Sequence, residues 1–275
     1  MYTSPAEYGV VGHPVAHSRS PFIHGIFAQR TNQNMIYRLH DVEPENLRNF
    51  VMEFWRRGGK GLNVTVPHKI SASGMVRAMS KRAERAGAVN TLFFDQDGIT
   101  GDNTDGAGLV RDLTANLKVE IRGARILLVG SGGAARGVIA PLLDASPELI
   151  LIGGRTASAA ENLARQFGSI GPVQACDLAA LAHGGFDIII NATSAGLVGE
   201  VPALPANVIH PDTFCYDMSY ARSGTAFLEW ARQRGVKRAA QGWGMLVEQA
   251  AESFELWRGV RPPTEPVLAA LRAGP

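Results

Sequence analysis

Residues 125–137 read RILLVGSGGAARG, and this stretch decides the fold. The apolar run at residues 126–129 is typical of a buried strand, and the glycines after it make a tight turn into a helix. Gly130 permits the turn, Gly132 lets the backbone approach a pyrophosphate, and Ala135 takes the position where helix and strand pack closely. Since N–H groups at the start of a helix attract anions, the stretch predicts a phosphate-binding turn.

The surroundings of this turn favour a dinucleotide site over an ordinary strand-to-helix connection. The helix is expected to open near Ala134. A second apolar strand, residues 149–152, follows at βαβ spacing and ends in the sequence GGRT at residues 153–156. A glycine-rich turn alone is a weak signal, so the prediction depends on the two strands together.

Composition indicates an ordinary globular chain of one large or two medium domains. Its 275 residues are 45% hydrophobic and 19% charged, which is enough to bury a large core. The net charge of +2 gives no reason to expect nucleic acid or a membrane as partner. Cys176 and Cys215 are expected to be unpaired core residues. Without a signal peptide or a membrane-spanning run in the sequence, the expected location is the cytoplasm.

The N-terminal part places hydroxyl groups beside a predicted helix. A strand at residues 8–12 leads into the sequence GHPVAHSRSP at residues 12–21, and a helix with an apolar face follows. Ser20 before Pro21 fits a helix N-cap. Ser18 and Ser20 together also put two hydroxyls at a helix N-terminus, which suits a small carboxylate.

Alternating elements in this half predict a parallel sheet with helical crossovers. We expect a strand at residues 35–39, a helix at 44–57, a strand at 61–66 and a helix opened by Pro67. Lys69 then lies in the first turn of that helix, where its charge opposes the helix dipole. A nearby acid would offset this charge, whereas a solvated surface lysine would need no such partner.

The candidate acid follows the next strand, which we expect at residues 88–94. The sequence GDNTDG at residues 101–106 forms a polar edge at a strand end, where open α/β sheets bind ligands. Asp105 is the candidate partner for the lysine. Two simpler interpretations stay open: Asp105 is a first-turn acid stabilised by the dipole, and Asp102 or Asn103 is a helix cap.

The second half continues the Rossmann-type alternation. A last long helix, expected from Met245 to about Trp257, can point Gln249 into a groove, although an exposed surface glutamine is equally compatible with the pattern. His13 and His17 lie four apart in a proline-containing loop without carboxylate or cysteine partners, so no metal site is predicted. The further elements are expected as strands at 187–191 and 214–218 and helices at 159–167 and 225–234.

Seven motifs occur in one order along nearly the whole chain, and together they resemble the shikimate dehydrogenase family. Agreement at one motif could arise by chance, but agreement at seven in order could not. The motifs are HSRSP at 17–21, NVTVPHK at 63–69, GAVNT at 87–91, GDNTDG at 101–106, GSGGA at 130–134, NATS at 191–194 and GMLVEQ at 244–249.

The resemblance implies an α/β fold in which an N-terminal α/β substrate domain faces a Rossmann-type NADP-binding domain, with the active site in the cleft between them. The substrate domain would be residues 1–105, completed by C-terminal helices in 241–275, and the NADP-binding domain residues 106–240. The implied reaction is the reversible NADPH-dependent reduction of 3-dehydroshikimate to shikimate in aromatic amino-acid (chorismate) biosynthesis. A monomer or a homodimer would fit.

The resemblance also implies roles for individual residues. Lys69 and Asp105 would be the catalytic pair, with Lys69 as proton donor and Asp105 orienting it and keeping it charged. Ser18 and Ser20 would hold the substrate carboxylate. The other substrate-binding residues would be Thr65, Asn90, Tyr220 and Gln249, and the cofactor-binding residues Gly130, Ser131, Gly132, Gly133, Ala134, Gly154, Arg155, Thr156, Thr193, Met218 and Gly242.

Three positions depart from the family pattern. The family often has Asn-Arg-Thr followed by a second arginine after the second Rossmann strand, but this chain has Gly154-Arg155-Thr156 and then Ala159. Trp243 replaces a smaller apolar residue and could crowd the nicotinamide end of the site. The alternatives are a relative acting on quinate or an aminated shikimate analogue, and a non-catalytic NADP-binding protein, which would need neither the lysine nor the aspartate.

Overall fold

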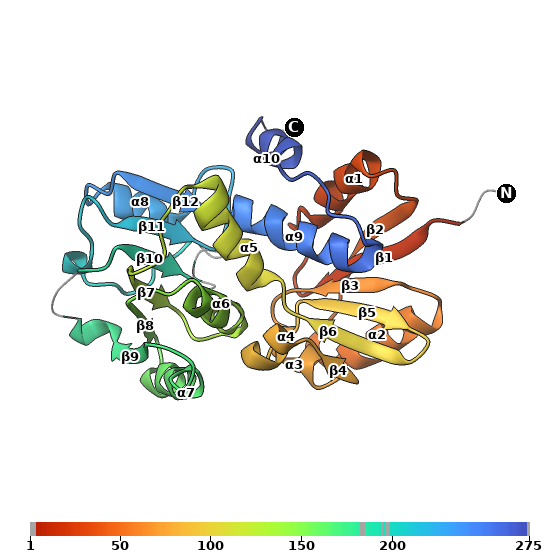
Figure 1. The fold of residues 1–275 in the computed structure, drawn as a ribbon, viewed down its shortest axis with the longest axis horizontal. Helices are drawn as coiled ribbons and strands as arrows, with labels where there is room; N and C mark the ends of the chain where they lie inside the picture. Colours follow the sequence, from red (N-terminus) through yellow and green to blue (C-terminus); the bar gives the residue numbers. More distant parts are fainter. Residues whose placement is uncertain (1–3, 182–184, 194, 196–198, 274–275) are drawn as a thin grey trace. The chain divides into compact units, whose positions relative to one another are not determined.

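The computed structural model describes residues 4–181, 185–193, 195 and 199–273, and the chain divides into two compact units (Figure 1). The first unit holds the chain up to Gly108 and from Leu246 onward, and the second unit is Leu109–Met245. Two helices, α5 (Asp105–Arg111) and α9 (Trp243–Arg258), contain the boundaries. Both units are α/β, as the sequence predicts.

The second unit is built on a parallel sheet with Rossmann topology. Its six strands lie in the order β12-β11-β10-β7-β8-β9, and every neighbouring pair is parallel. The chain order therefore reverses between β7 and β10, where sheets of this type bind ligands at their carboxyl ends. The strands are β7 (Arg125–Val129), β8 (Leu149–Gly154), β9 (Val173–Asp177), β10 (Ile188–Asn191), β11 (Phe214–Asp217) and β12 (Arg238–Gln241).

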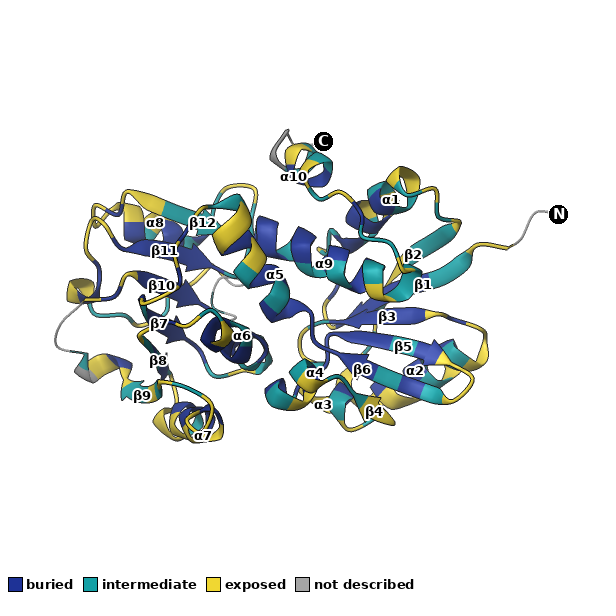
Figure 2. Cartoon of the chain, viewed as in Figure 1, coloured by how far each residue is buried: buried dark blue, intermediate teal, exposed yellow. Residues whose placement is uncertain are grey.

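Strand β7 shows why this sheet is covered on both faces. Ile126 and Leu128 belong to one apolar core, whereas Leu127 and Val129 belong to another. Successive side chains of a strand point to opposite faces, so an unbroken apolar run fills two cores at once. Figure 2 shows the central strands as buried. The helices of this unit include α6 (Gly133–Asp144), α7 (Ala157–Phe167) and α8 (Ala226–Arg232).

The two cysteines differ in burial. Cys215 lies in the second unit's core, as predicted, but Cys176 on β9 is only half-buried, because β9 is an edge strand. Both thiols are free. Within the described part of the chain, every helix falls short of the length and apolarity needed to cross a membrane.

The first unit also has a six-stranded sheet, but it is mixed, so the prediction of a parallel sheet is wrong here. Strand β5 pairs antiparallel with both β3 and β6, while β1 pairs parallel with β2 and β3. The order is β2-β1-β3-β5-β6-β4. The strands are β1 (Ala6–Gly12), β2 (Met35–Asp41), β3 (Gly61–Val64), β4 (Ala78–Met79), β5 (Thr91–Asp95) and β6 (Gly98–Asp102).

A tight hairpin between β5 and β6 causes this change of direction. The Asp95 carboxylate accepts hydrogen bonds from the N–H groups of Asp97 (2.8 Å) and Gly98 (3.0 Å). Gly98 has a φ of +134°, which glycine adopts without strain. An Asp-Gly pair between apolar runs is a strong hairpin signal, so residues 91–102 form two strands rather than one strand and a crossover.

The remaining predicted bounds shift slightly in the first unit. Strand β3 ends at Val64, and the following helix begins at Lys69 rather than at Pro67, because the N–H of His68 donates to the Thr65 carbonyl (2.9 Å) in an intervening turn. The helices of this unit are α1 (Ser20–Arg30), α2 (Leu47–Arg56), α3 (Lys69–Ser73), α4 (Lys81–Ala86) and α10 (Glu265–Ala273), together with most of α9.

His24 on α1 lies inside an aromatic cluster of the first unit. Its ring is 1% exposed and stacks on Tyr37, with ring centres 4.1 Å apart, and Phe254 lies 6.1 Å away. Burial lowers the pKa of His24 to about 3 from its ordinary value of 6.5, so the ring stays neutral. Neither ring nitrogen has a hydrogen-bond partner among the described residues.

His24 should make the folded state sensitive to acid. The unfolded chain takes up a proton on this side chain below about pH 6.5 and the folded chain does not, so stability is lost as the pH falls below that value. Between pH 7 and pH 5 the loss should be about 2 kcal/mol. Urea unfolding of wild type and His24→Phe at both pH values measures it. The phenylalanine keeps the ring contacts, and the same loss in both proteins would contradict this assignment.

Candidate active site

Lys69 and Asp105 form a nearly buried ion pair in the first unit. The Lys69 Nζ lies 2.5 Å from Asp105 Oδ2, and the two side chains are 15% and 5% exposed. Lys69 is the first residue of α3, and Asp105 is the first residue of α5. The acid expected near the lysine is therefore present, and the interpretation of Lys69 as a solvated surface residue is wrong.

The second carboxylate oxygen of Asp105 is also occupied. Asn90 Nδ2 donates to Asp105 Oδ1 at 2.9 Å, so the carboxylate is held from both sides. The N–H of Asp105 donates to Asn103 Oδ1 at 3.1 Å, so the Asn103 side chain satisfies the first N–H group of α5. Since a charged pair out of water needs its remaining bonding groups satisfied, these contacts help to stabilise it.

Asp102 anchors the same turn but does not cap the helix. Its carboxylate accepts from Arg82 Nε (2.7 Å) and Nη2 (3.0 Å), and from the hydroxyl of Ser80. It also accepts from the N–H of Asn103 (2.6 Å). Neither cap candidate of the sequence lies at the N-cap position, which is Thr104: Asn103 accepts from the N–H of the first helical residue, and Asp102 ties the turn to α4.

Gln249 of α9 lies next to Asn90. Asn90 Nδ2 is 3.4 Å from Gln249 Oε1, and Thr104 Oγ1 is 3.5 Å from the same oxygen. Gln249 Nε2 donates to the Leu246 carbonyl (2.8 Å), which fixes the direction of the amide. The alternative of an exposed surface glutamine is wrong, because the residue is half-buried within a polar cluster.

Ser18 and Ser20 lie together at the start of α1. Ser18 Oγ accepts from the N–H of Ser20 (3.3 Å) and donates to Ser20 Oγ (3.2 Å). The N-cap is Arg19, and Ser20, the first helical residue, makes no capping bond with its side chain. The prediction of Ser20 as N-cap is therefore wrong, because the helix begins one residue earlier than the Ser-Pro pattern indicates.

Strand β3 positions Asn63 and Thr65. Thr65 comes directly after the strand, and its methyl group lies against Gly12, where an added side-chain carbon would be 2.4 Å away. Asn63 is 6% exposed and bonds to Ser253, 2.9 Å away on α9. Neither Asn63 nor Ser253 was selected from the sequence, although Asn63 shares a strand face with Thr65 and Ser253 lies one helical turn beyond Gln249.

The glycine turn in the second unit has the properties of a phosphate cradle. Gly130 has a φ of +119°, and a side-chain carbon there would be 3.1 Å from the Ala192 backbone. Gly132 is the N-cap of α6, without a side-chain capping bond, and a carbon added to it would meet no atom within 4 Å. The first N–H groups of α6, from Gly133 and Ala134 on, therefore have no side-chain cap and can face an anion.

The end of β8 carries a cation and no acid. Arg155 and Thr156 follow the strand and are exposed. Thr156 is the N-cap of α7, but its hydroxyl makes no capping bond. Arg155 makes no ion pair with any residue that the structure describes. Gly154 lies beside Ser131, since an added carbon would be 3.4 Å from the Ser131 hydroxyl.

Two further strand ends complete this edge of the second unit. After β10, Thr193 donates to Asn191 Oδ1 through its N–H (3.1 Å) and its hydroxyl (2.7 Å), while Ser194 of the same motif lies outside the described residues. After β11, the backbone of Met218 lies close to Gly242: a side-chain carbon added to Gly242 would be 2.4 Å from the Met218 carbonyl oxygen.

Tyr220 belongs to the second unit. Its ring packs against that of Trp243 with the ring centres 4.3 Å apart. The larger side chain at position 243 therefore contacts a predicted substrate-binding tyrosine, and its effect on the nicotinamide end stays a prediction.

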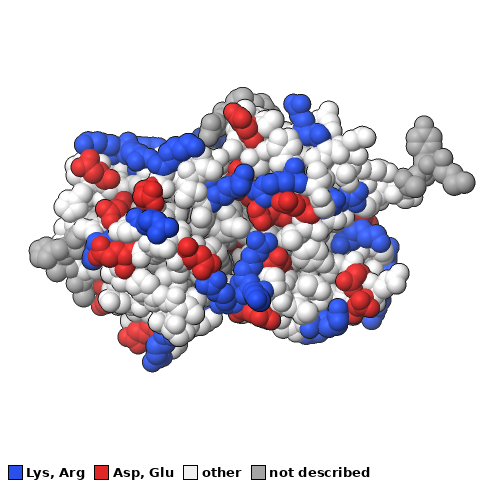
Figure 3. Space-filling model, viewed as in Figure 1, with Lys and Arg blue, Asp and Glu red and all other residues white. Residues whose placement is uncertain are grey.

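Outside the lysine–aspartate pair, the exposed loop before α1 holds an ion pair. His13 pairs with Asp41 (2.6 Å), and this hydrogen bond raises the pKa of the exposed histidine. In the described residues there is no group of three or more His, Cys, Asp or Glu side chains placed to hold a metal ion. Basic and acidic side chains alternate over the face shown in Figure 3.

A Rossmann-type unit with a phosphate cradle, together with an α/β unit that carries a lysine–aspartate pair, defines a nucleotide-dependent oxidoreductase. Sequence profiles agree with this class. The profile of the shikimate dehydrogenase substrate binding domain matches residues 10–92, that of shikimate / quinate 5-dehydrogenase residues 112–198, and that of the shikimate 5'-dehydrogenase C-terminal domain residues 242–272.

Full-length comparisons identify the family. The chain is 50% identical to shikimate dehydrogenase (NADP(+)) of Methylococcus capsulatus, covering 98% of each chain. It is 54% identical to the enzyme of the same name from Hahella chejuensis, covering 97% of this chain and 98% of the relative. The crystal structure of shikimate 5-dehydrogenase from Thermus thermophilus, in complex with NADP(H) and shikimate, has a TM-score of 0.87 at 31% identity, covering 98% of this chain and 99% of the other. The chain belongs to the shikimate dehydrogenase family.

Proposed function

We propose that this chain catalyses the reversible, NADP-dependent interconversion of 3-dehydroshikimate and shikimate, a step in aromatic amino-acid biosynthesis. The observation that carries the proposal is the Lys69–Asp105 pair, which Asn90 holds by a hydrogen bond. The same unit contains the hydroxyls of Ser18 and Ser20 at the start of a helix. A protein that only bound NADP would need neither charge of the pair. We assign substrate binding to the first unit and NADP binding to the second.

The first unit offers complementary groups for a hydroxylated ring carboxylic acid. Ser18 and Ser20 can donate hydrogen bonds to the carboxylate at the N-terminus of α1, where the helix dipole favours an anion. The side chains of Thr65, Asn90 and Gln249 supply donors and acceptors for ring hydroxyls. We include Tyr220 of the second unit among the substrate contacts.

Lys69 is the proton donor and acceptor in this proposal. Reduction of the ketone leaves developing negative charge on oxygen, and an ammonium group can stabilise that charge and donate the proton. In the reverse direction the lysine, as the neutral amine, takes the proton from the substrate hydroxyl. Asp105 orients Lys69 through their hydrogen bond. NADP, when bound, supplies or accepts the hydride.

The second unit fits NADP by its own geometry. The open space at Gly132 and the uncapped N-terminus of α6 suit a pyrophosphate, held by residues 130–134. Arg155 and Thr156 would hold the 2′-phosphate, since a guanidinium makes charge-assisted bonds to phosphate oxygens and no acid at the end of β8 opposes them. We assign Thr193, Met218 and Gly242 to the rest of the dinucleotide.

The proposed assembly is a monomer or a homodimer, and the proposed location is the cytoplasm. The assembly is proposed from the family resemblance. Light scattering of the purified protein at several concentrations distinguishes the two assemblies from any larger one.

The direct test is the absorbance of reduced nicotinamide after mixing the protein with shikimate and NADP. Quinate and an aminated shikimate analogue are run alongside, because one altered ring contact can redirect specificity. The proposal expects the highest kcat/KM with shikimate. A higher kcat/KM with either analogue would overturn the substrate assignment. If none of the three compounds is turned over, the protein binds NADP without catalysing this reaction.

Replacing Ser18 and Ser20 by alanine should mainly raise KM for shikimate, because their contacts to the carboxylate are equal in the ground and transition states. A hydrogen bond to a charged group contributes about 1.5–3 kcal/mol, so the increase should be on the order of 10- to 100-fold. Ser73→Ala is the control, since that hydroxyl bonds to the Ile70 carbonyl of its own helix. An unchanged KM in the double variant would remove the serines from the site.

NADP should be preferred over NAD, but less steeply than in relatives with a second arginine, because Ala159 leaves the phosphate held from one side. Arg155→Ala should raise KM for NADP and scarcely change KM for NAD. Arg234→Ala is the matched control, an exposed arginine of the same unit that packs over Trp230, 4.5 Å from the ring centre. Equal kcat/KM for the two cofactors in the wild-type enzyme would overturn this interpretation.

A further inference from the structure

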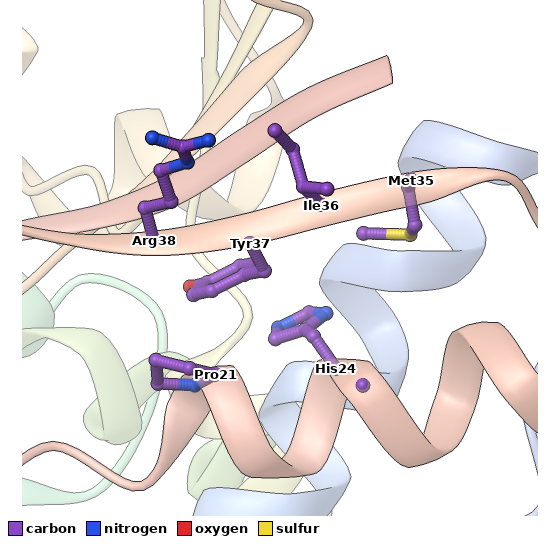
Figure 4. A pocket seen from close by; sticks show the side chains of 7 residues that line it. Pro21, His24, Met35, Ile36, Tyr37 and Arg38 are labelled. Atoms are coloured by element: carbon purple, nitrogen blue, oxygen red, sulfur yellow. The ribbon is translucent and has the colours of Figure 1, made fainter. Parts of the chain in front are cut away.

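Tyr37 on β2 faces His24 on α1 across the edge of the first unit's sheet. Figure 4 shows the two rings lying one over the other, beside a cavity of about 350 Å³ between α1 and β2. The rings are nearly parallel, with an angle of 6° between their planes. This stacking fixes the plane of the tyrosine ring and thereby the direction of its hydroxyl.

The Tyr37 hydroxyl bonds away from the stack, toward the polar cluster. It donates to Asn63 Oδ1 at 2.7 Å. Burial raises the pKa of Tyr37 well above its ordinary value of 10, while the neighbouring Ser20 hydroxyl lowers it. The phenol is therefore a constant donor at physiological pH, and the second group beside it is one of the two proposed carboxylate contacts.

The hydrogen bond from Tyr37 satisfies the oxygen of the Asn63 amide. Asn63 Nδ2 faces three acceptors: the Asn90 carbonyl (3.2 Å), Thr91 Oγ1 (3.2 Å) and Ser253 Oγ (2.9 Å). A flipped amide would set its oxygen against the Asn90 carbonyl, which can only accept. The Asn90 carbonyl thus sets the orientation of the buried amide, and in that orientation Tyr37 supplies the donor for Asn63 Oδ1.

From Asn63 the hydrogen bonds continue to the groups proposed to hold ring hydroxyls. Thr91 Oγ1 donates to Asn90 Oδ1 at 2.8 Å, and Ser253 Oγ donates to the Gln249 carbonyl at 3.1 Å. Asn90 in turn holds Asp105. The network therefore connects the carboxylate side of the proposed substrate site to its hydroxyl side.

We propose that Tyr37 is a positioning residue for substrate binding, which acts through Asn63 and Ser20 without touching the substrate. The inference rests on the proposed function, because it takes the serine and asparagine contacts from there. Removing the phenolic oxygen leaves the acceptor of Asn63 unsatisfied, so the amide and its neighbours lose their single arrangement. Binding of substrate must then restore that arrangement, which weakens binding.

The test is Tyr37→Phe, which keeps the ring stack on His24 and removes only the hydroxyl. We expect KM for shikimate to rise by about 5- to 30-fold, the effect of one lost buried hydrogen bond, with kcat within about 2-fold of wild type. KM for NADP should not change. Tyr8→Phe is the matched control: it is a buried tyrosine of the neighbouring strand, beside Trp257, and its hydroxyl contacts Arg258 (3.4 Å) instead of the cluster.

Asn63→Asp is a second arm that does not alter Tyr37. It keeps the acceptor for the phenol but removes the donor toward Asn90 and Ser253, so it should also raise KM for shikimate. An unchanged KM in folded Tyr37→Phe or Asn63→Asp, or an equal rise in Tyr8→Phe, would overturn the positioning role. A wild-type enzyme that does not oxidise shikimate overturns the proposed function instead, which keeps the two failures apart.

Discussion

The nearly buried ion pair between Lys69 and Asp105 is the constraint on which the proposed active site depends. Removing two charges from water costs more than their attraction returns unless further hydrogen bonds satisfy both groups. Here Asn90 donates to the second carboxylate oxygen, and Asn103 accepts from the N–H of Asp105 at the start of the helix. The dipole of α5 adds a favourable interaction with the carboxylate at its N-terminus.

This ion pair explains why many polar side chains hold the turn that precedes α5. Arg82 holds Asp102, which accepts from the N–H of Asn103 and so fixes the residues that present Asp105. Arg82 also reaches Glu252 of α9, 3.4 Å away, which links the N-terminal part of the first unit to its C-terminal helix. The C-terminal segment is thus required to complete a site whose charged pair comes from the first 105 residues.

In the second unit the corresponding constraint is steric rather than electrostatic. The strand order reverses between β7 and β10. Directly after β7, Gly130 adopts a positive φ, and its backbone lies close to the backbone of Ala192. Gly132 then leaves the N-terminus of α6 uncovered. A dinucleotide can be held by such a backbone with few side chains, so we propose that the choice between NADP and NAD depends on residues after β8 such as Arg155.

Local signals in the sequence were sufficient for the Rossmann-type unit, whereas the pairing of Lys69 with Asp105, 36 residues apart, followed from the family resemblance. Apolar runs and glycines report directly on buried strands and tight turns. The mixed sheet was predicted wrongly because strand direction depends on which strands pair, although Asp97-Gly98 already indicated a hairpin. Ser20 was misassigned because a cap and a first helical residue differ by one position. Tyr37 and Asn63 escaped notice because their bond joins residues 26 apart, which no local pattern records.

Lys69 and Asp105 act as one unit in the proposed mechanism, and kcat for shikimate oxidation in three variants tests this claim most directly. Groups that act as a unit are strongly non-additive when removed. Lys69→Ala should lower kcat by roughly 10²- to 10⁴-fold, with Lys81→Ala, another lysine that begins a short helix of the first unit, unchanged. Asp105→Asn should lower kcat as well, and the double variant should be no slower than Lys69→Ala alone. Losses that multiply fully in the double variant, or near-wild-type turnover in Lys69→Ala, would contradict this mechanism.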